Sequence, residues 1–165
     1  PIREEFADKS VVIMDDSIVR GSTIGRIVQL VRAQGAREVH VAITSPPVLF
    51  PCYYGIDMST PEELAARQIY GPAPRKDRLE DARRVVENAL TRYLDVDSLI
   101  YLSVKSLQEM RNGGRCAACF DGDYPVPIPE ADRLDIEDNR RRHGVRCAAV
   151  GGGSGSGVSG MFRPV

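Results

Sequence analysis

The chain has 165 residues, 42% of them hydrophobic, which is enough for one ordinary hydrophobic core. Its net charge of -1 lacks the basic excess typical of nucleic-acid-binding domains, and it contains no apolar run long enough to cross a membrane. Four cysteines in a chain without a signal-peptide pattern predict a cytoplasmic location, where thiols bind metals rather than form disulfides.

The first predicted element is a strand over residues 11–14, which are all apolar. A continuous apolar run is typical of a parallel strand that is covered on both faces. Asp15 and Asp16 follow at its carboxyl end, where open α/β folds bind their ligands. Two carboxylates there can accept hydrogen bonds from a vicinal diol or hold a hydrated Mg²⁺ ion.

A loop of small and polar residues follows the two carboxylates. It consists of Ser17, Ile18, Val19, Arg20, Gly21, Ser22 and Thr23. Ile24, Ile27, Val28 and Val31 then recur at helical spacing, with Gly35 as the C-terminal cap. A phosphate can bind there to hydroxyls, to backbone N–H groups and to the positive end of the helix dipole. Ordinary helix capping by the same residues is an open alternative.

The remaining pattern predicts further α/β elements. Residues 38–45 and 99–102 are expected as strands, and residues 77–94 as a helix. Thr60, Pro61 and Glu63 are typical of a helix start with a capping box. Ser103 is a candidate cap for a helix ending near Arg111, and residues 112–114 form a predicted turn.

The run of residues 14–23 resembles the phosphoribosylpyrophosphate motif of type I phosphoribosyltransferases. Together with residues 38–57, 60–64 and 116–125 it closely resembles the glutamine phosphoribosylpyrophosphate amidotransferases, over about residues 1–129. The resemblance implies an α/β fold with a doubly wound parallel sheet and flanking helices. It also implies the first committed step of purine biosynthesis, in which glutamine-derived ammonia displaces pyrophosphate from phosphoribosylpyrophosphate.

The same resemblance assigns roles to the residues of this loop. It places Asp15 and Asp16 at the ribose hydroxyls and the Mg²⁺ ion, and the loop from Ser17 to Thr23 around the 5′-phosphate. Arg20 either pairs with the charge of the substrate or is a solvated loop arginine.

The cysteines form a second candidate site. Cys116 and Cys119 have the C-x-x-C spacing that lets two thiolates reach one metal or cluster. In members of the resembled family with a 4Fe-4S cluster, cysteines matching Cys52, Cys116 and Cys119 are ligands. The fourth family ligand lies upstream of the region represented here; Cys147 is a less favoured substitute, and a zinc site is the chemical alternative.

The resemblance also predicts partners and domain boundaries. The family has an N-terminal glutaminase half, with a catalytic cysteine that this chain does not offer, and an upstream part of the transferase domain. We therefore expect residues 1–129 to be the C-terminal portion of that domain, inactive and unstable alone, within a homo-oligomeric enzyme. A charged extension is expected over residues 130–150 and a Gly/Ser linker with a short tail over residues 151–165.

Two alternatives to the enzyme reading concern the C-terminal part. In the first, the chain is a noncatalytic fragment or an engineered scaffold whose Gly/Ser linker presents residues 158–165 to a partner. In the second, residues 158–165 are a tail without a partner. The arginine run 140–142 is not taken as a nucleic-acid site, because acidic residues surround it.

Overall fold

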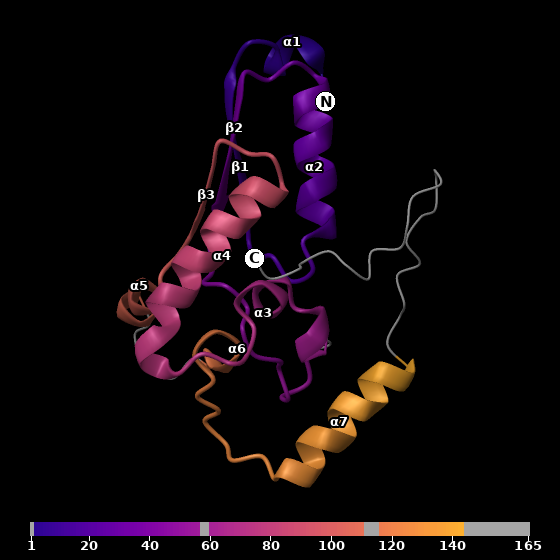
Figure 1. The fold of residues 1–165 in the computed structure, drawn as a ribbon, viewed down its shortest axis with the longest axis vertical. Helices are drawn as coiled ribbons and strands as arrows, with labels where there is room; N and C mark the ends of the chain where they lie inside the picture. Colours follow the sequence, from indigo (N-terminus) through magenta and orange to yellow (C-terminus); the bar gives the residue numbers. More distant parts are fainter. Residues whose placement is uncertain (1, 57–59, 111–115, 144–165) are drawn as a thin grey trace.

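The computed structural model describes residues 2–56, 60–110 and 116–143. At its centre is a parallel three-stranded sheet in the order β1 (Ser10–Asp15), β2 (Glu38–Ile43) and β3 (Ser98–Tyr101) (Figure 1). The helices are α1 (Arg3–Phe6), α2 (Ser22–Ala33), α3 (Ala65–Tyr70), α4 (Leu79–Tyr93), α5 (Val104–Met110), α6 (Ala118–Asp121) and α7 (Glu130–His143), with 3-10 turns η1 (Pro61–Glu63) and η2 (Lys76–Arg78). The predicted α/β class with a parallel sheet is confirmed.

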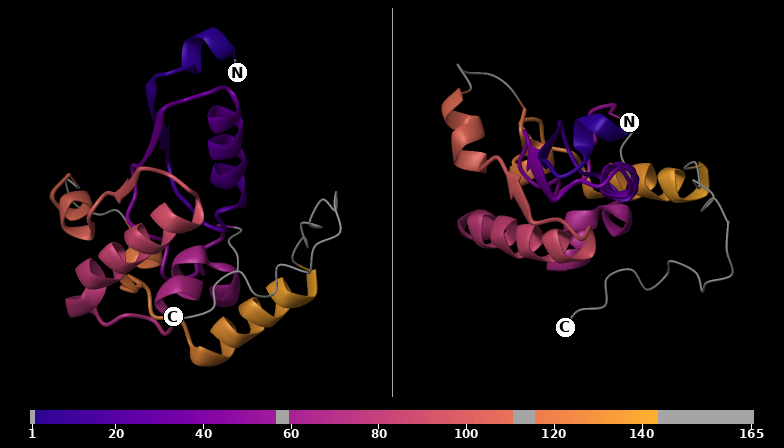
Figure 2. Two further views of the ribbon diagram at one scale, coloured as in Figure 1. Left: turned by 45° about the horizontal axis from the view of Figure 1, so that its top comes forward. Right: turned by 90° about the horizontal axis from the view of Figure 1, so that it is seen from above.

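The hydrophobic core lies between one face of the sheet and the helices α2 and α4, which Figure 2 shows beside the strands from two further directions. Its buried side chains from α2 and α4 are Ile24, Val28, Val31, Ala82, Val86 and Leu90. On the strands, Val39, Val41, Ile43, Leu99 and Tyr101 point to the same core. The sheet therefore presents every second residue to the helices, as strand geometry requires.

The other face of the sheet differs from the sequence prediction. Burial alternates along β1, and the side chains of Val12, Met14 and Ile100 are 61%, 70% and 59% exposed. The expectation that β1 is covered on both faces is therefore wrong for the described residues, which supply nothing that covers these three side chains. The apolar run nevertheless has the composition of a doubly covered strand, because its outward residues are as apolar as its inward ones.

Most predicted element boundaries are close to those observed. Gly35 follows α2 with a φ of 87°, and the Oγ of Ser103 accepts a hydrogen bond from the amide of Ser106 at 2.9 Å in the first turn of α5. Tyr93, the last residue of α4, is 43% exposed. The predicted turn over residues 112–114 lies outside the described residues.

The helix α7 was not predicted, because residues 130–143 carry no apolar stripe. It lies at the end of the molecule opposite α1 (Figure 1). None of the helices in the described ranges is both long and apolar enough to cross a membrane.

Candidate functional site

The loop between β1 and α2 lies at the carboxyl end of the sheet. The backbone carbonyl of Asp15 accepts hydrogen bonds from the amide of Thr44 at 3.0 Å and from its hydroxyl at 3.3 Å, which ties the end of β1 to the residue after β2. One carboxylate oxygen of Asp15 accepts the amide of Asp16 at 2.9 Å, and the Asp16 side chain is exposed. The chain thus leaves the sheet with both carboxylates at this edge.

The start of α2 has no side-chain cap. Gly21 occupies the N-cap position in a left-handed conformation, with φ of 80°, and is buried. Ser22 and Thr23 are exposed in the first turn, while Ile18 is 3% exposed and anchors the loop in the core. Neither carboxylate caps α2, and no side chain among the described residues accepts a hydrogen bond from its first-turn N–H groups.

The segment that begins at Thr60 is bonded to this loop. The amide of Ala65 donates to the carbonyl of Val19 at 2.8 Å, and Arg20 forms an ion pair with Glu63 at 3.2 Å. Glu63 also accepts a hydrogen bond from the amide of Thr60 at 3.2 Å, as the predicted capping box requires. Arg20 is therefore paired within the chain rather than fully solvated.

The cysteine-bearing segments form a separate site. The amides of Leu49 and Phe50 both donate to the carbonyl of Cys119 at 3.0 Å, which joins the segment before Cys52 to α6. All three described cysteines are free thiols; Cys52 and Cys119 are half-buried and Cys116 is exposed. Burial, and to a smaller degree the charges of Cys52 and then Cys116, raise the pKa of the Cys119 thiol to about 11.

The donor chemistry of this site suits a thiolate-ligated metal or cluster. In residues 2–56, 60–110 and 116–143, however, no group of three or more His, Cys, Asp or Glu side chains is arranged to hold a metal ion. The same finding applies to Asp15 and Asp16, which form only a pair. Cys147 lies outside the described residues.

Sequence reasoning missed the contribution of α7. Arg140 donates a hydrogen bond to the carbonyl of Cys52 at 2.6 Å, across 88 residues of sequence. The signal that could have indicated it is the spacing of Arg133, Glu137 and Arg140, which places three charged groups on one helix face.

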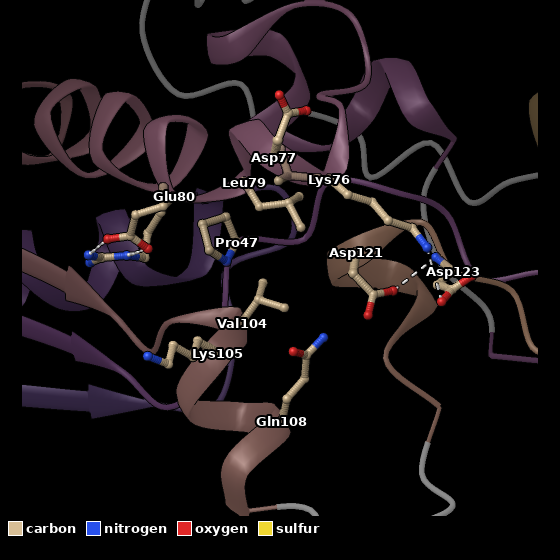
Figure 3. Close-up of a pocket in the computed structure, with 12 residues that line it drawn as sticks. Pro47, Lys76, Asp77, Leu79, Glu80, Val104, Lys105, Gln108, Asp121 and Asp123 are labelled. Carbon is tan, nitrogen blue, oxygen red and sulfur yellow. Dashed lines mark hydrogen bonds and ion pairs between the residues drawn. The ribbon is translucent and has the colours of Figure 1, made fainter.

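A hollow of about 370 Å³ lies between the start of α4, the start of α5 and residues 121–123 (Figure 3). Pro47, Leu49, Leu79 and Val104 give it apolar walls, and charged side chains surround them. One of these charges, Lys76, is paired with Asp123 at 3.1 Å. None of the site residues predicted from the sequence lines this hollow.

Comparison with known proteins identifies relatives for most of the chain, although no protein-family model matches it. The amidophosphoribosyltransferase of Methanothermobacter thermautotrophicus is 42% identical over 132 residues, which are 78% of this chain and 24% of that protein. The amidophosphoribosyltransferase of Mycobacterium tuberculosis is 35% identical over 156 residues, which are 92% of this chain and 28% of that protein.

Solved structures agree with this result. The glutamine phosphoribosylpyrophosphate amidotransferase from B. subtilis, complexed with ADP and GMP, matches with a TM-score of 0.56 and 40% identity. A second structure, described as the allosteric regulatory enzyme of purine biosynthesis, has a TM-score of 0.57 and 39% identity. Each match covers 78% of this chain and 26% of the other chain. The chain therefore spans about a quarter of the length of the relatives it matches.

Proposed function

Because the chain belongs to the amidophosphoribosyltransferase family, we propose that its β1–α2 loop is the ribose-phosphate site of an enzyme that converts phosphoribosylpyrophosphate and ammonia to phosphoribosylamine and pyrophosphate. The ammonia comes from glutamine, in a glutaminase portion that this chain does not contain. The reaction is the first committed step of purine biosynthesis.

The observation that carries this proposal is the start of α2, where the N-cap residue Gly21 supplies no side-chain cap, beside the carboxylates of Asp15 and Asp16. First-turn N–H groups without a side-chain acceptor, together with the helix dipole, favour a bound phosphate group. The loop Ser17 to Thr23 would hold the 5′-phosphate there. The buried, left-handed Gly21 allows the backbone of this loop to approach the ligand closely.

The two carboxylates suit the chemistry of the displacement. Loss of pyrophosphate builds positive charge on the ribose ring, so carboxylates that hold its hydroxyls stabilise the transition state more than the ground state. Asp15 and Asp16 would also hold the Mg²⁺ ion, which neutralises the charge of the departing pyrophosphate. Ammonia is the nucleophile, and the bond from the anomeric carbon to pyrophosphate oxygen is the one that breaks.

Cys52, Cys116 and Cys119 are the proposed ligands of a 4Fe-4S cluster, with a fourth ligand from outside this chain or, less favoured, from Cys147. The support is the C-x-x-C spacing of Cys116 and Cys119, the backbone hydrogen bonds that join the segment before Cys52 to Cys119, and the family membership. The cluster is assigned no step in the displacement. A zinc ion in its place would show as zinc without iron and sulfide in the purified protein.

The proposed enzyme also requires more protein than this chain. Its partners would be the glutaminase portion and the upstream part of the transferase domain, within a homo-oligomer in the cytoplasm. Sedimentation of the native assembly, with its intact mass and its iron, sulfide and zinc content, tests these proposals on one sample.

Binding of phosphoribosylpyrophosphate is the sharpest test of the site. We expect calorimetry with Mg²⁺ to show binding by the purified native assembly that contains this chain, and at least tenfold weaker binding by the same assembly with Asp16→Asn. Asp135→Asn, on the exposed surface of α7, is the matched control and should bind as the unchanged protein does. Equal affinity in all three proteins, or no binding by any of them, would overturn the proposed ribose-phosphate site.

A further inference from the structure

Two segments carry the three described cysteines, and each is short of regular secondary structure. The Cys52 segment is residues 49–56, and the Cys116 segment is residues 116–126. The only regular element in either is the single turn of α6. Backbone hydrogen bonds to the carbonyl of Cys119 join the two segments at one point. The other hydrogen bonds and ring contacts between the two segments are made by side chains. These side chains therefore help to determine how the cysteines lie relative to one another.

Tyrosine hydroxyls supply the first set of connections. Tyr124 donates to the carbonyl of Pro51, the residue before Cys52, at 2.6 Å. Tyr54 donates to the carbonyl of Val126 at 2.6 Å and accepts from the amide of the same residue at 3.0 Å. All three hydrogen bonds run between the Cys52 segment and the Cys116 segment.

One face of α7 supplies the second set. Arg133 and Glu137 are one turn apart, and the guanidinium of Arg133 lies 5.7 Å and 5.1 Å from the ring centroids of Tyr53 and Tyr124. Glu137 accepts the hydroxyl of Tyr53 at 2.5 Å. Arg133 therefore stacks on one tyrosine from each cysteine-bearing segment, an attraction that grows when the cation is partly desolvated.

Arg140 lies one further turn along the same face. Its Nη2 donates to the carbonyl of Cys52 at 2.6 Å and to the carbonyl of Ile56 at 3.2 Å. Its Nη1 is buried and has no hydrogen-bond partner among the described residues. Hydrogen bonds from a charged donor to backbone carbonyls are stronger than neutral ones, so Arg140 fixes the backbone of the Cys52 segment at Cys52 and at Ile56.

We propose that α7 is a clasp for the cysteine site, in which Arg140 is the positioning residue for Cys52 and Arg133 holds the two cysteine-bearing segments together. The clasp is built from ionic, stacking and hydrogen-bond contacts rather than from an apolar stripe. Hydrogen bonds have preferred distances and angles, whereas the hydrophobic effect has no direction. The inference deepens the proposed cluster site and rests on Cys52, Cys116 and Cys119 being its ligands.

Substitution of Arg140 tests the clasp, with Arg142 as the matched control. Arg142 lies on the same helix, is exposed, and pairs only with Asp138 of its own helix among the described residues. Hydrogen–deuterium exchange of the Cys52 segment is the first measurement, because it does not depend on any metal. We expect Arg140→Met to raise exchange there at least fivefold, Arg140→Lys to restore part of the protection, and Arg142→Met to change nothing.

Iron and sulfide content, with the visible absorption of the cluster, is the second measurement. Arg140→Met should retain less than half of the iron of the unchanged protein, and Arg142→Met should retain all of it. If Arg140→Met fails to fold, Tyr53→Phe removes only the hydroxyl bonded to Glu137 and should raise exchange in the same segment.

The outcomes separate the two proposals. Absence of iron from the unchanged protein would overturn the cluster, while the exchange data would still decide whether α7 holds the Cys52 segment. Equal exchange of that segment in Arg140→Met and Arg142→Met would overturn the clasp, and so would full iron retention by Arg140→Met. The ribose-phosphate site is measured independently, by binding of phosphoribosylpyrophosphate.

Discussion

Arg20 and Glu63 form an ion pair, with the Nη2 of Arg20 3.2 Å from a carboxylate oxygen of Glu63, although 43 residues separate them. The pair joins the β1–α2 loop to the segment that begins at Thr60. Both side chains are partly exposed, so the pair contributes about 0 to 1 kcal/mol to stability. Its consequence for the proposed ribose-phosphate site is electrostatic, because the carboxylate of Glu63 would compete with a bound phosphate for Arg20.

Glu63→Gln tests that competition. Glutamine keeps the capping-box acceptor for Thr60 and removes the charge. We expect phosphoribosylpyrophosphate to bind up to about fivefold more tightly, the equivalent of a surface ion pair of about 1 kcal/mol. The control is Glu62→Gln, whose carboxylate pairs with Arg141 instead of the loop. Weaker binding by Glu63→Gln would instead mean that the ion pair positions the loop.

The left-handed backbone of Gly21 leads to a second prediction. An added Cβ would lie 3.9 Å from the nearest atom of Ile18, so Gly21→Ala meets no clash, only the cost of a positive φ. We expect a loss of about 1 to 2 kcal/mol in the free energy of unfolding, measured by urea denaturation. Gly25→Ala, inside α2, should be neutral or stabilising, because its Cβ makes an ordinary contact with Leu94. Equal losses in both variants would contradict this account.

Glu87 connects α4 to β3 and supplies the third prediction. One of its oxygens accepts the amide of Tyr101 at 2.8 Å and also pairs with Arg83, while its side chain is only 14% exposed. Glu87→Ala leaves the amide of the buried Tyr101 without its acceptor and removes one of the two carboxylates that pair with Arg83, so we expect a loss of about 1 to 3 kcal/mol in the free energy of unfolding.

Glu80→Ala is the control for this measurement. Glu80 also pairs with Arg83, but its side chain is 48% exposed. Thermal denaturation should show a loss below about 1 kcal/mol for this variant. A comparable loss in the two variants would mean that the bond to β3 contributes little.

The uncovered sheet face predicts association of the 165-residue chain. Val12 and Met14 on β1 and Ile100 on β3 expose apolar side chains, and both strands are edge strands of the described sheet. We expect sedimentation velocity to show concentration-dependent association, and the double variant Met14→Lys with Ile100→Lys to reduce it. Leu30→Lys, at an exposed position on α2, is the control and should have no effect. A chain that stays monomeric at all concentrations would contradict the prediction.

The sequence by itself determined the elements that depend on local patterns. The apolar run before Asp15, the helical spacing from Ile24 to Val31 and the capping residues Thr60 and Ser103 act over a few neighbouring residues, so each is legible in a single stretch of chain. The motifs at residues 14–23 and 116–119 identified the family for the same reason.

Only the tertiary structure decided the rest. Arg20 has its partner 43 residues away and Arg140 contacts Cys52 across 88 residues, distances at which spacing carries no information. Whether both faces of β1 are covered likewise depends on which elements pack against it. An apolar residue such as Met14 can be buried or exposed, so its type alone does not tell which. Long-range contacts form where chain entropy is overcome by packing, and that balance is set by the whole fold rather than by any local pattern.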